Sequence, residues 1–599
     1  MFDQKNHPLK TALLAAVLSV PYMWTGVVAS LPALYNELWA CFITSLVLCA
    51  LFFSNNKYTN ISGIARESSP ALAVIGGLIC SIAIQSRFGF ANAYFGVTGL
   101  AIGVLMLALI CVVCGAFLSH VLNDAERNAL SYRAAWIVLI IGLLQAFIGL
   151  LQYLELNLIS TTLMSALTIA GRVYGNLRQP NHFALLLIVS LAACFSLLLS
   201  MQETQKRTNR FLMMCVIFLV MLIVLSVSRV GLLLLILLSI WGAFKCKSKR
   251  NIQFLFISLV PLYFVFRLGF IWIDEQDILP FWGNARVFSL SASGNQDRLS
   301  IFTSVVGTLL ESPVLGVGYG RLSQATFENG HAWALTKNLE SAHNLFVDWA
   351  LYFGMPIAIV LAVLLLLCVV RCIHHAKFGV GWLGFFVLLA PLVAHMVEYP
   401  LEFPRFLLPW AGLLGFLMVK RGAHTSIATK ETDKAAFGVN ITKMLSLICL
   451  LFSALVAWIA ADFRKVNPIY SQSSTPFSSR VVAAYDSHFF VHLVDYAVLM
   501  ASAPEPAAAK LQFRLAEKVT QVRFDGPVLS VYVPVAVLSG NVCFAKAAAY
   551  NGFKADQETY QKLVTGWLQS PHQSVRSFAE ANMQPKPALW PKKAQRQCD

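Results

Sequence analysis

Apolar stretches long enough to cross a lipid bilayer recur between residues 11 and 462. The hydrocarbon core is about 30 Å thick, and a helix needs roughly 17–25 apolar residues to span it. Only 12% of the residues are charged, against about a quarter in a soluble domain. The sequence therefore predicts an all-α, polytopic membrane bundle of about thirteen transmembrane helices, near residues 12–32, 38–54, 70–88, 98–118, 134–153, 181–201, 211–227, 230–244, 253–273, 343–370, 379–397, 405–419 and 441–462.

Lys and Arg residues gather in alternate loops, for example Lys245, Lys247, Lys249 and Arg250. Basic loops face the cytoplasm, and the odd number of spans then places residues 274–342 and the segment after 462 on the outward side. We predict a transmembrane domain over 1–462, containing the outward loop 274–342, and an outward helical domain over 463–599. The net charge of +16 mainly reflects this topology, so we expect no nucleic-acid partner.

The segment 463–599 carries Ala-rich amphipathic stretches, such as 503–520 and 541–568, interrupted by prolines. This pattern predicts short packed helices, arranged as helix-pair repeats that offer a concave surface to a protein acceptor or form a passive cap. Cys543 and Cys598 are the cysteines of this tail. An oxidising compartment would allow them to form a disulfide, but the sequence does not fix the distance between them.

His343 lies where a long polar segment gives way to an apolar run. The positive end of the helix dipole and nearby arginines both disfavour a protonated imidazole, so His343 is suited to act as a general base. The alternative is a hydrogen-bonded histidine at the membrane interface. Asp348 and Glu340 are near in sequence, but neither has the spacing that shares a helical face with His343.

Arginines on the outward side contradict the general topology pattern and are candidate anion ligands. Arg229 lies in or at the edge of hydrocarbon, where a cation costs at least about 2.5–3.5 kcal/mol, and Arg298 begins an amphipathic segment. The planar guanidinium matches phosphate oxygens. The alternatives are snorkelling of Arg229 to the interface and an ion pair between Asp297 and Arg298.

Two further polar segments lie on the same predicted side. The first, residues 171–184, opens the span near 181 at Pro180, and an exposed helix N-terminus suits an anion or a sugar hydroxyl. The second is the turn 397–406, for which aromatic anchoring at the interface is the alternative. Their candidate ligands are Arg178, Gln179, Asn181, Tyr399 and Arg405, with Glu398 and Glu402 beside them.

These residues together favour a lipid-linked anion as substrate, with pyrophosphate the simplest choice. Charge would build up on a departing pyrophosphate, and the arginines would stabilise it. The sequence contains no His-Glu-x-x-His motif. Its Cys-x-x-Cys pair, Cys111 and Cys114, lies within the predicted span 98–118, where cysteine usually behaves as a small apolar residue. Neither a metal site nor a cofactor is therefore predicted.

Three motifs resemble those of the O-antigen ligase and polymerase superfamily: Ser-Arg-x-Gly at 228–231, Asp-Arg-Leu-Ser-Ile-Phe at 297–302 leading to Ser-Pro-Val-Leu-Gly-Val-Gly at 312–318, and Ala-His-Asn-Leu-Phe-Val-Asp at 342–348. The run Asn-Leu-Arg-Gln-Pro-Asn-His at 176–182 and the outward tail resemble the protein-directed branch, the bacterial O-oligosaccharyltransferases of PglL type. The resemblance covers about residues 130–420 well and the tail weakly.

The resemblance implies transfer of a preassembled glycan from undecaprenyl pyrophosphate to Ser or Thr hydroxyls of periplasmic proteins such as pilin, without metal or nucleotide sugar. It places the protein in the bacterial inner membrane, in contact with membrane lipid, with its site facing the periplasm. His343 resembles the essential histidine, Arg229 and Arg298 the phosphate-interacting arginines, and Gln179 and Tyr399 functional positions of the protein-directed branch. One departure is Phe302, where many ligases have Trp.

Other interpretations of the sequence stay open. Within the same superfamily, the acceptor would be lipid A-core, or the reaction would extend a polysaccharide. A membrane transporter would also have many spans and intramembrane charges. The gathering of charges on one face, rather than at the midplane of two repeated halves, argues against transport.

Overall fold

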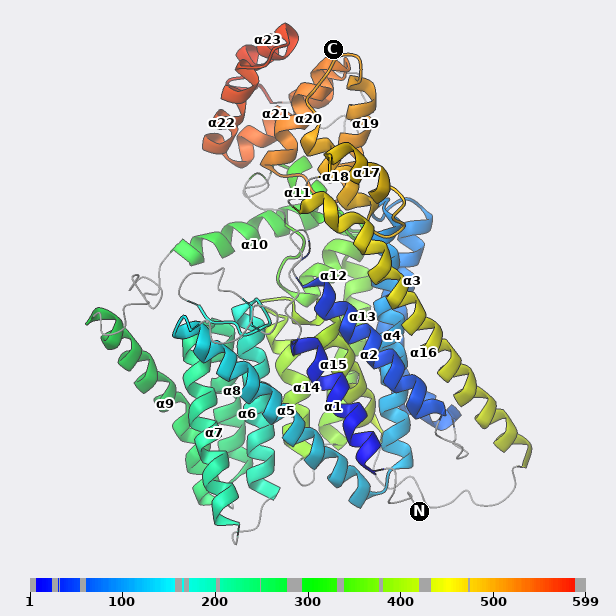
Figure 1. Cartoon of the computed structure of the whole chain (residues 1–599), viewed down its shortest axis with the longest axis vertical. Coiled ribbons are helices and arrows are strands. Elements are labelled where there is room, and N and C mark those ends of the chain that lie inside the picture. The colour runs from blue at the N-terminus through cyan, green and yellow to red at the C-terminus, as the bar shows by residue number, and fades with distance from the viewer. Residues whose placement is uncertain are drawn as a thin grey trace. The chain divides into compact units, whose positions relative to one another are not determined.

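A computed structural model describes residues 7–23, 31, 33–53, 61–156, 164–165, 172–200, 205–247, 249–276, 293–330, 335, 339–375, 381–419, 432–471 and 475–587. These residues form helices joined by turns and loops, and none of them forms a β-strand (Figure 1). The all-α prediction is confirmed.

Each predicted span contains one helix, except 343–370, which contains two. The helices are α1 (His7–Met23), α2 (Leu34–Phe53), α3 (Ile61–Arg87), α4 (Phe95–Val121), α5 (Asp124–Tyr153), α6 (Pro180–Ser200), α7 (Lys206–Leu225), α8 (Arg229–Lys245), α9 (Arg250–Glu275), α12 (Leu345–Phe353), α13 (Met355–His375), α14 (Gly381–Ala394), α15 (Pro404–Met418) and α16 (Thr432–Val466).

Nine helices in the described part of the chain contain a stretch long and apolar enough to cross a membrane: α2, α3, α4, α5, α6, α7, α9, α13 and α16. The helices of the other spans are shorter: α1 and α8 have 17 residues, α15 has 15, α14 has 14 and α12 has 9. The polytopic helical fold is confirmed, and the number of crossings stays a prediction.

The apolar run 343–370 is divided at Gly354, which ends α12 with a φ of 85°. Only glycine adopts this conformation readily. The space around Gly354 gives a second reason, because a Cβ there would lie 1.9 Å from the backbone oxygen of Val314. The nine-residue helix α12 is therefore separate from α13, the helix that is long enough to cross a membrane.

The chain divides into two compact units. The first comprises residues 1–76, 106–291 and 364–458, and the second comprises 77–105, 292–363 and 459–599. In the first unit α6 packs against α5, α7, α8 and α14, and these helices share one hydrophobic core. Gly142 allows α5 and α6 to approach closely, because a Cβ at this position would lie 2.1 Å from Ser190 Oγ.

The second unit contains the short helices of the tail. They are α17 (Phe477–Ala484), α18 (Val491–Ala501), α19 (Ala509–Val519), α20 (Gly526–Leu538), α21 (Val542–Ala555), α22 (Gln557–Leu568) and α23 (Gln573–Ala581), preceded by the 3₁₀ turn η4 (Asn467–Tyr470). From α17 on, consecutive helices pack on one another. The expected packing of short helices is therefore observed. Cys543 is disulfide-bonded, and Cys598 lies outside the described residues.

The tail helices share their core with a segment that precedes His343. The short helix α11 (Leu322–Glu328) carries Phe327, which stacks on Phe524 with ring centroids 3.8 Å apart. The amide of Phe524 donates to Ser323 Oγ at 3.0 Å, and the amide of Gly526 donates to the oxygen of Leu335 at 2.9 Å. The tail thus packs on Ser323, Phe327 and Leu335. The predicted domain boundary at 462 stays a prediction.

Candidate active site

His343 lies in the second unit, directly before the N-terminus of α12. Asn344 caps this helix, because its side-chain oxygen accepts from the amides of Phe346 and Val347 at 3.2 and 3.3 Å. The predicted position at a helix start is therefore observed. His343 has a φ of 58°, and a residue other than glycine held in this left-handed region costs about 1–3 kcal/mol.

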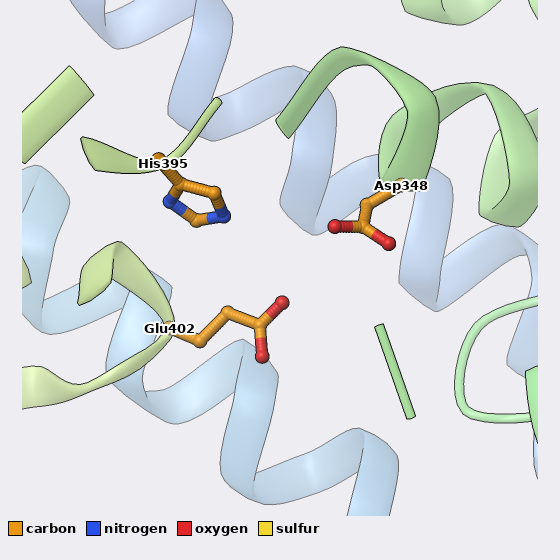
Figure 2. Close-up of side chains that lie close together, drawn as sticks. All are labelled: Asp348, His395 and Glu402. Atoms are coloured by element: carbon orange, nitrogen blue, oxygen red, sulfur yellow. The ribbon is translucent and has the colours of Figure 1, made fainter. Parts of the chain in front are cut away.

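The carboxylate of Asp348, in the first turn of α12, is hydrogen-bonded to the loop that carries His343. Ser341 donates its hydroxyl to Asp348 Oδ2 at 2.8 Å, and the Ala342 amide donates to Oδ1 at 2.6 Å. Figure 2 shows this buried side chain. Burial raises the pKa of Asp348 to about 6, although the two hydrogen bonds favour the charged form. The carboxylate therefore stabilises the backbone that precedes α12.

The first unit brings together three of the polar motifs. Asn181 donates its amide to Glu398 Oε1 at 2.7 Å, and Gln179 donates to Glu398 Oε2 at 3.5 Å. Ser228 donates its hydroxyl to Asn181 Oδ1 at 2.7 Å and accepts from the Gly231 amide at 3.0 Å as the N-cap of α8. We call Gln179, Asn181, Ser228 and Glu398 the amide–carboxylate cluster. It joins the N-termini of α6 and α8 to the turn that follows α14.

Two predicted phosphate ligands flank this cluster. Arg229 is the first residue of α8 and its side chain is exposed. Arg178 has a φ of 59°, and its Nε donates to Ser165 Oγ at 3.3 Å. Burial and the positive charge of Arg405 lower the pKa of Arg178. Positive side chains beside the N-termini of α6 and α8 make this region of the first unit attractive to an anion.

Arg405, a predicted glycan or acceptor ligand, is buried in the first unit with 2% exposure. Its Nε lies 3.2 Å from Glu37 Oε1, its amide donates to Glu37 Oε2 at 3.0 Å, and Nη2 donates to the oxygen of Leu177 at 3.4 Å. These contacts connect three elements: α2, α15 and the segment that precedes α6. The burial of Arg405 favours an indirect, positioning role over direct contact with a ligand.

Tyr399, the other predicted ligand of the turn, is half-buried beside an aromatic group that surrounds His182. The His182 ring lies 6.2 Å from the Tyr399 ring, 4.8 Å from Phe403 and 5.3 Å from Phe406. His182 is 1% exposed, and among the described residues neither of its ring nitrogens has a hydrogen-bond partner. Aromatic packing therefore fixes this histidine, in the first turn of α6, against Tyr399, Phe403 and Phe406.

Figure 2 also shows His395, directly after α14, and Glu402, the last residue of the 3₁₀ turn η3 (Pro400–Glu402). His395 is buried, and one ring nitrogen lies within 4.8 Å of a Glu402 carboxylate oxygen. Nothing in the sequence pattern pointed to His395, which follows the apolar helix α14. The sequence also did not predict that Asn181 hydrogen-bonds to both Ser228 and Glu398. A signal for Ser228 was present, because a serine directly before an apolar helix is a common N-cap.

Arg298 lies in the first turns of α10 (Ser293–Glu311), but its side chain is outside what the structure describes. Its predicted contact with pyrophosphate is therefore still a prediction. Arg172, in the polar segment 171–184, has local structural contacts. Its Nε donates to the oxygen of Ser226 at 3.2 Å and Nη2 to that of Val227 at 3.3 Å, directly before α8.

Residues 213–362, which include Arg229, Arg298 and His343, match the O-antigen ligase family. The chain is 24% identical over 455 residues to the ComP-specific O-oligosaccharyltransferase of Acinetobacter baylyi, covering 73% of this chain and 75% of the relative. It is 22% identical over 360 residues to the general O-oligosaccharyltransferase of the same organism, covering 59% and 61%.

The long apolar helices of the described residues and the relatives together indicate a multi-pass membrane glycosyltransferase. Within that class, residues 213–362 match the O-antigen ligase family, and the chain is similar to O-oligosaccharyltransferases. The resemblance carried by the motifs around Arg229, Arg298 and His343 is confirmed.

Proposed function

We propose that this protein transfers a preassembled oligosaccharide en bloc from undecaprenyl pyrophosphate to Ser or Thr hydroxyls of periplasmic proteins such as pilin. The observation that carries the proposal is the placement of His343 in a left-handed conformation before the capped N-terminus of α12. Strained residues other than glycine concentrate at functional sites. The similarity to O-oligosaccharyltransferases supports a protein as the acceptor.

In the proposed reaction, the imidazole of His343 accepts the proton of the acceptor hydroxyl. The hydroxyl oxygen forms a bond to the anomeric carbon of the first sugar, and the bond between that carbon and the pyrophosphate oxygen breaks. Undecaprenyl pyrophosphate leaves with the electron pair. Arg229, Arg298 and Arg178 stabilise its charge, so the step requires neither a metal nor another cofactor.

We further propose that Gln179, Asn181, Tyr399 and Arg405 form the glycan or acceptor side of the site. Gln179 and Asn181 are already oriented by Glu398, and Tyr399 is half-buried with one ring face stacked on Phe403. Arg405 would act indirectly, through its contact with the segment before α6.

We place the protein in the bacterial inner membrane with this site facing the periplasm. Reporter fusions after residues 250 and 425 should then read as cytoplasmic, and fusions near 320 and 480 as periplasmic. The opposite result at any of these four positions would contradict the topology and the common side of the predicted ligands.

The reaction is tested with purified protein, undecaprenyl-pyrophosphate-linked oligosaccharide, and a pilin-like protein or lipid A-core as acceptor. We expect glycan on the protein acceptor, and we expect His343→Ala to reduce transfer by about 10²–10⁴-fold while donor binding is retained. Arg298→Lys keeps the charge but loses the planar fork, so transfer should fall substantially. Near-normal turnover by His343→Ala would refute the base assignment, and glycan on lipid A-core alone would identify a ligase.

A further inference from the structure

Two side chains of α12 hold the backbone that carries His343. Asp348 accepts the Ser341 hydroxyl and the Ala342 amide, while Tyr352 donates its hydroxyl to the backbone oxygen of Glu340. Asp348 and Tyr352 are four residues apart, so they lie on the same face of α12, one turn from each other. This face is therefore fastened to the loop at three consecutive residues, 340–342.

A third link reaches His343 itself. The His343 amide donates to Ser341 Oγ at 3.1 Å, and the same hydroxyl donates to Asp348 at 2.8 Å. The Asp348 amide in turn donates to the backbone oxygen of Asn344 at 2.8 Å. The residues on both sides of His343 are thus bonded to Asp348, and a hydrogen-bonded chain runs from its carboxylate through Ser341 to the His343 backbone.

We propose that Asp348 is a positioning residue for His343, acting through Ser341 and assisted by Tyr352. The inference rests on the proposed role of His343 as general base. A general base must lie within hydrogen-bond reach of the proton that it accepts. Left-handed residues persist only where the surrounding structure holds them, and these hydrogen bonds hold the backbone around His343.

The location of Asp348 suits this role. Its side chain is buried, and both of its oxygens bind the loop. Ser341 is also buried, so solvent cannot easily replace a lost hydrogen bond there. Loss of the carboxylate should therefore allow the loop to relax and His343 to move. A displacement of about 1 Å at a catalytic group can cost about 10²-fold in rate.

The test uses full-length protein with undecaprenyl-pyrophosphate-linked oligosaccharide and a Ser-containing acceptor peptide. Asp348→Ala should lower kcat by about 10- to 100-fold, with the KM for the donor changed by less than about twofold. Asp348→Asn should recover much of the rate, because its amide oxygen still accepts from Ala342 and its nitrogen can donate to Ser341 Oγ.

Two smaller changes guard against a variant that fails to fold. Tyr352→Phe deletes one hydroxyl and Ser341→Ala deletes another, and each should lower kcat by about 3- to 10-fold. Ser341→Thr keeps the hydroxyl and serves as the matched control. Asp348→Ala in a His343→Ala background should cause no further loss of the residual transfer, because Asp348 acts only through His343.

The outcomes separate the inference from the proposed function. An unchanged kcat in Asp348→Ala and Tyr352→Phe, with His343→Ala inactive, would overturn the positioning role alone. A collapse of kcat, donor affinity and the thermal transition in both Tyr352→Phe and Ser341→Ala would also overturn it, since the contacts would then serve general folding. Full activity of His343→Ala would remove the general base and the positioning role with it.

Discussion

Removing the ring of Phe327 tests whether the segment before His343 is part of the tail core. Phe327 is fully buried and stacks on Phe524 at 3.8 Å with an interplanar angle of 25°. Replacing a buried Phe by Ala typically costs about 3–5 kcal/mol. Because every 1.4 kcal/mol is a factor of ten, the population of opened tail core should rise by at least about a hundredfold.

The assay is amide hydrogen exchange of α20 in the intact, detergent-solubilised protein. Phe327→Ala should speed exchange in α20 and also lower transfer to a short acceptor peptide, since the segment that leads to His343 loosens. Leu511→Ala is the control, because Leu511 lies in α19, outside the motifs of the candidate site, and is 72% exposed. Such a change costs within about 0.5 kcal/mol. Equal exchange and equal transfer in the two variants would refute the shared core.

Three further outcomes follow from the site and the tail. Arg229→Lys should raise the donor KM and lower transfer, because lysine lacks the planar fork; unchanged donor kinetics would exclude bidentate contact. Glu398→Gln should destabilise the first unit by about 1–3 kcal/mol, since two donating amides would then face one oxygen, and thermal unfolding measures this. Burial lowers the pKa of His492 from 6.5 to about 4. Stability should therefore fall as pH drops from 6.5 to 4, and His492→Phe should weaken this fall.

The helices were predictable because they depend on local properties of the sequence. An apolar stretch long enough to cross a membrane must form a helix to satisfy its backbone hydrogen bonds. Each predicted span does contain a helix. The start of α6 at Pro180 agrees with the preference of proline for the first helical turn. The helix start next to His343 was likewise predictable from one short segment of sequence.

The contacts of the candidate site depend on residues far apart in the chain. Asn181 and Glu398 are 217 residues apart, so neither segment alone could identify the other as its partner. The break at Gly354 follows from its close approach to Val314. The hydrophobic periodicity of the sequence gives no sign of this contact. The hydrogen bonds of Asp348 to the loop before α12 were not predicted for a different reason. The i, i+4 spacing rule applies to two residues of the same helix. His343 has a left-handed backbone and lies before α12, so the rule does not apply to His343 and Asp348.

Burial separates the arginines that we predict to lie on the outward side, because Arg405 is buried and Arg229 is exposed. Arg405 is ion-paired with Glu37 and enclosed by α2 and α15, and removing one partner of a buried pair costs about 3–5 kcal/mol. Its charge nevertheless acts on its surroundings, because it helps to lower the pKa of Arg178. A phosphate beside Arg178 would relieve that repulsion. We therefore expect the charge of Arg405 to add to the attraction of the N-terminus of α6 for an anion, less the part that Glu37 offsets.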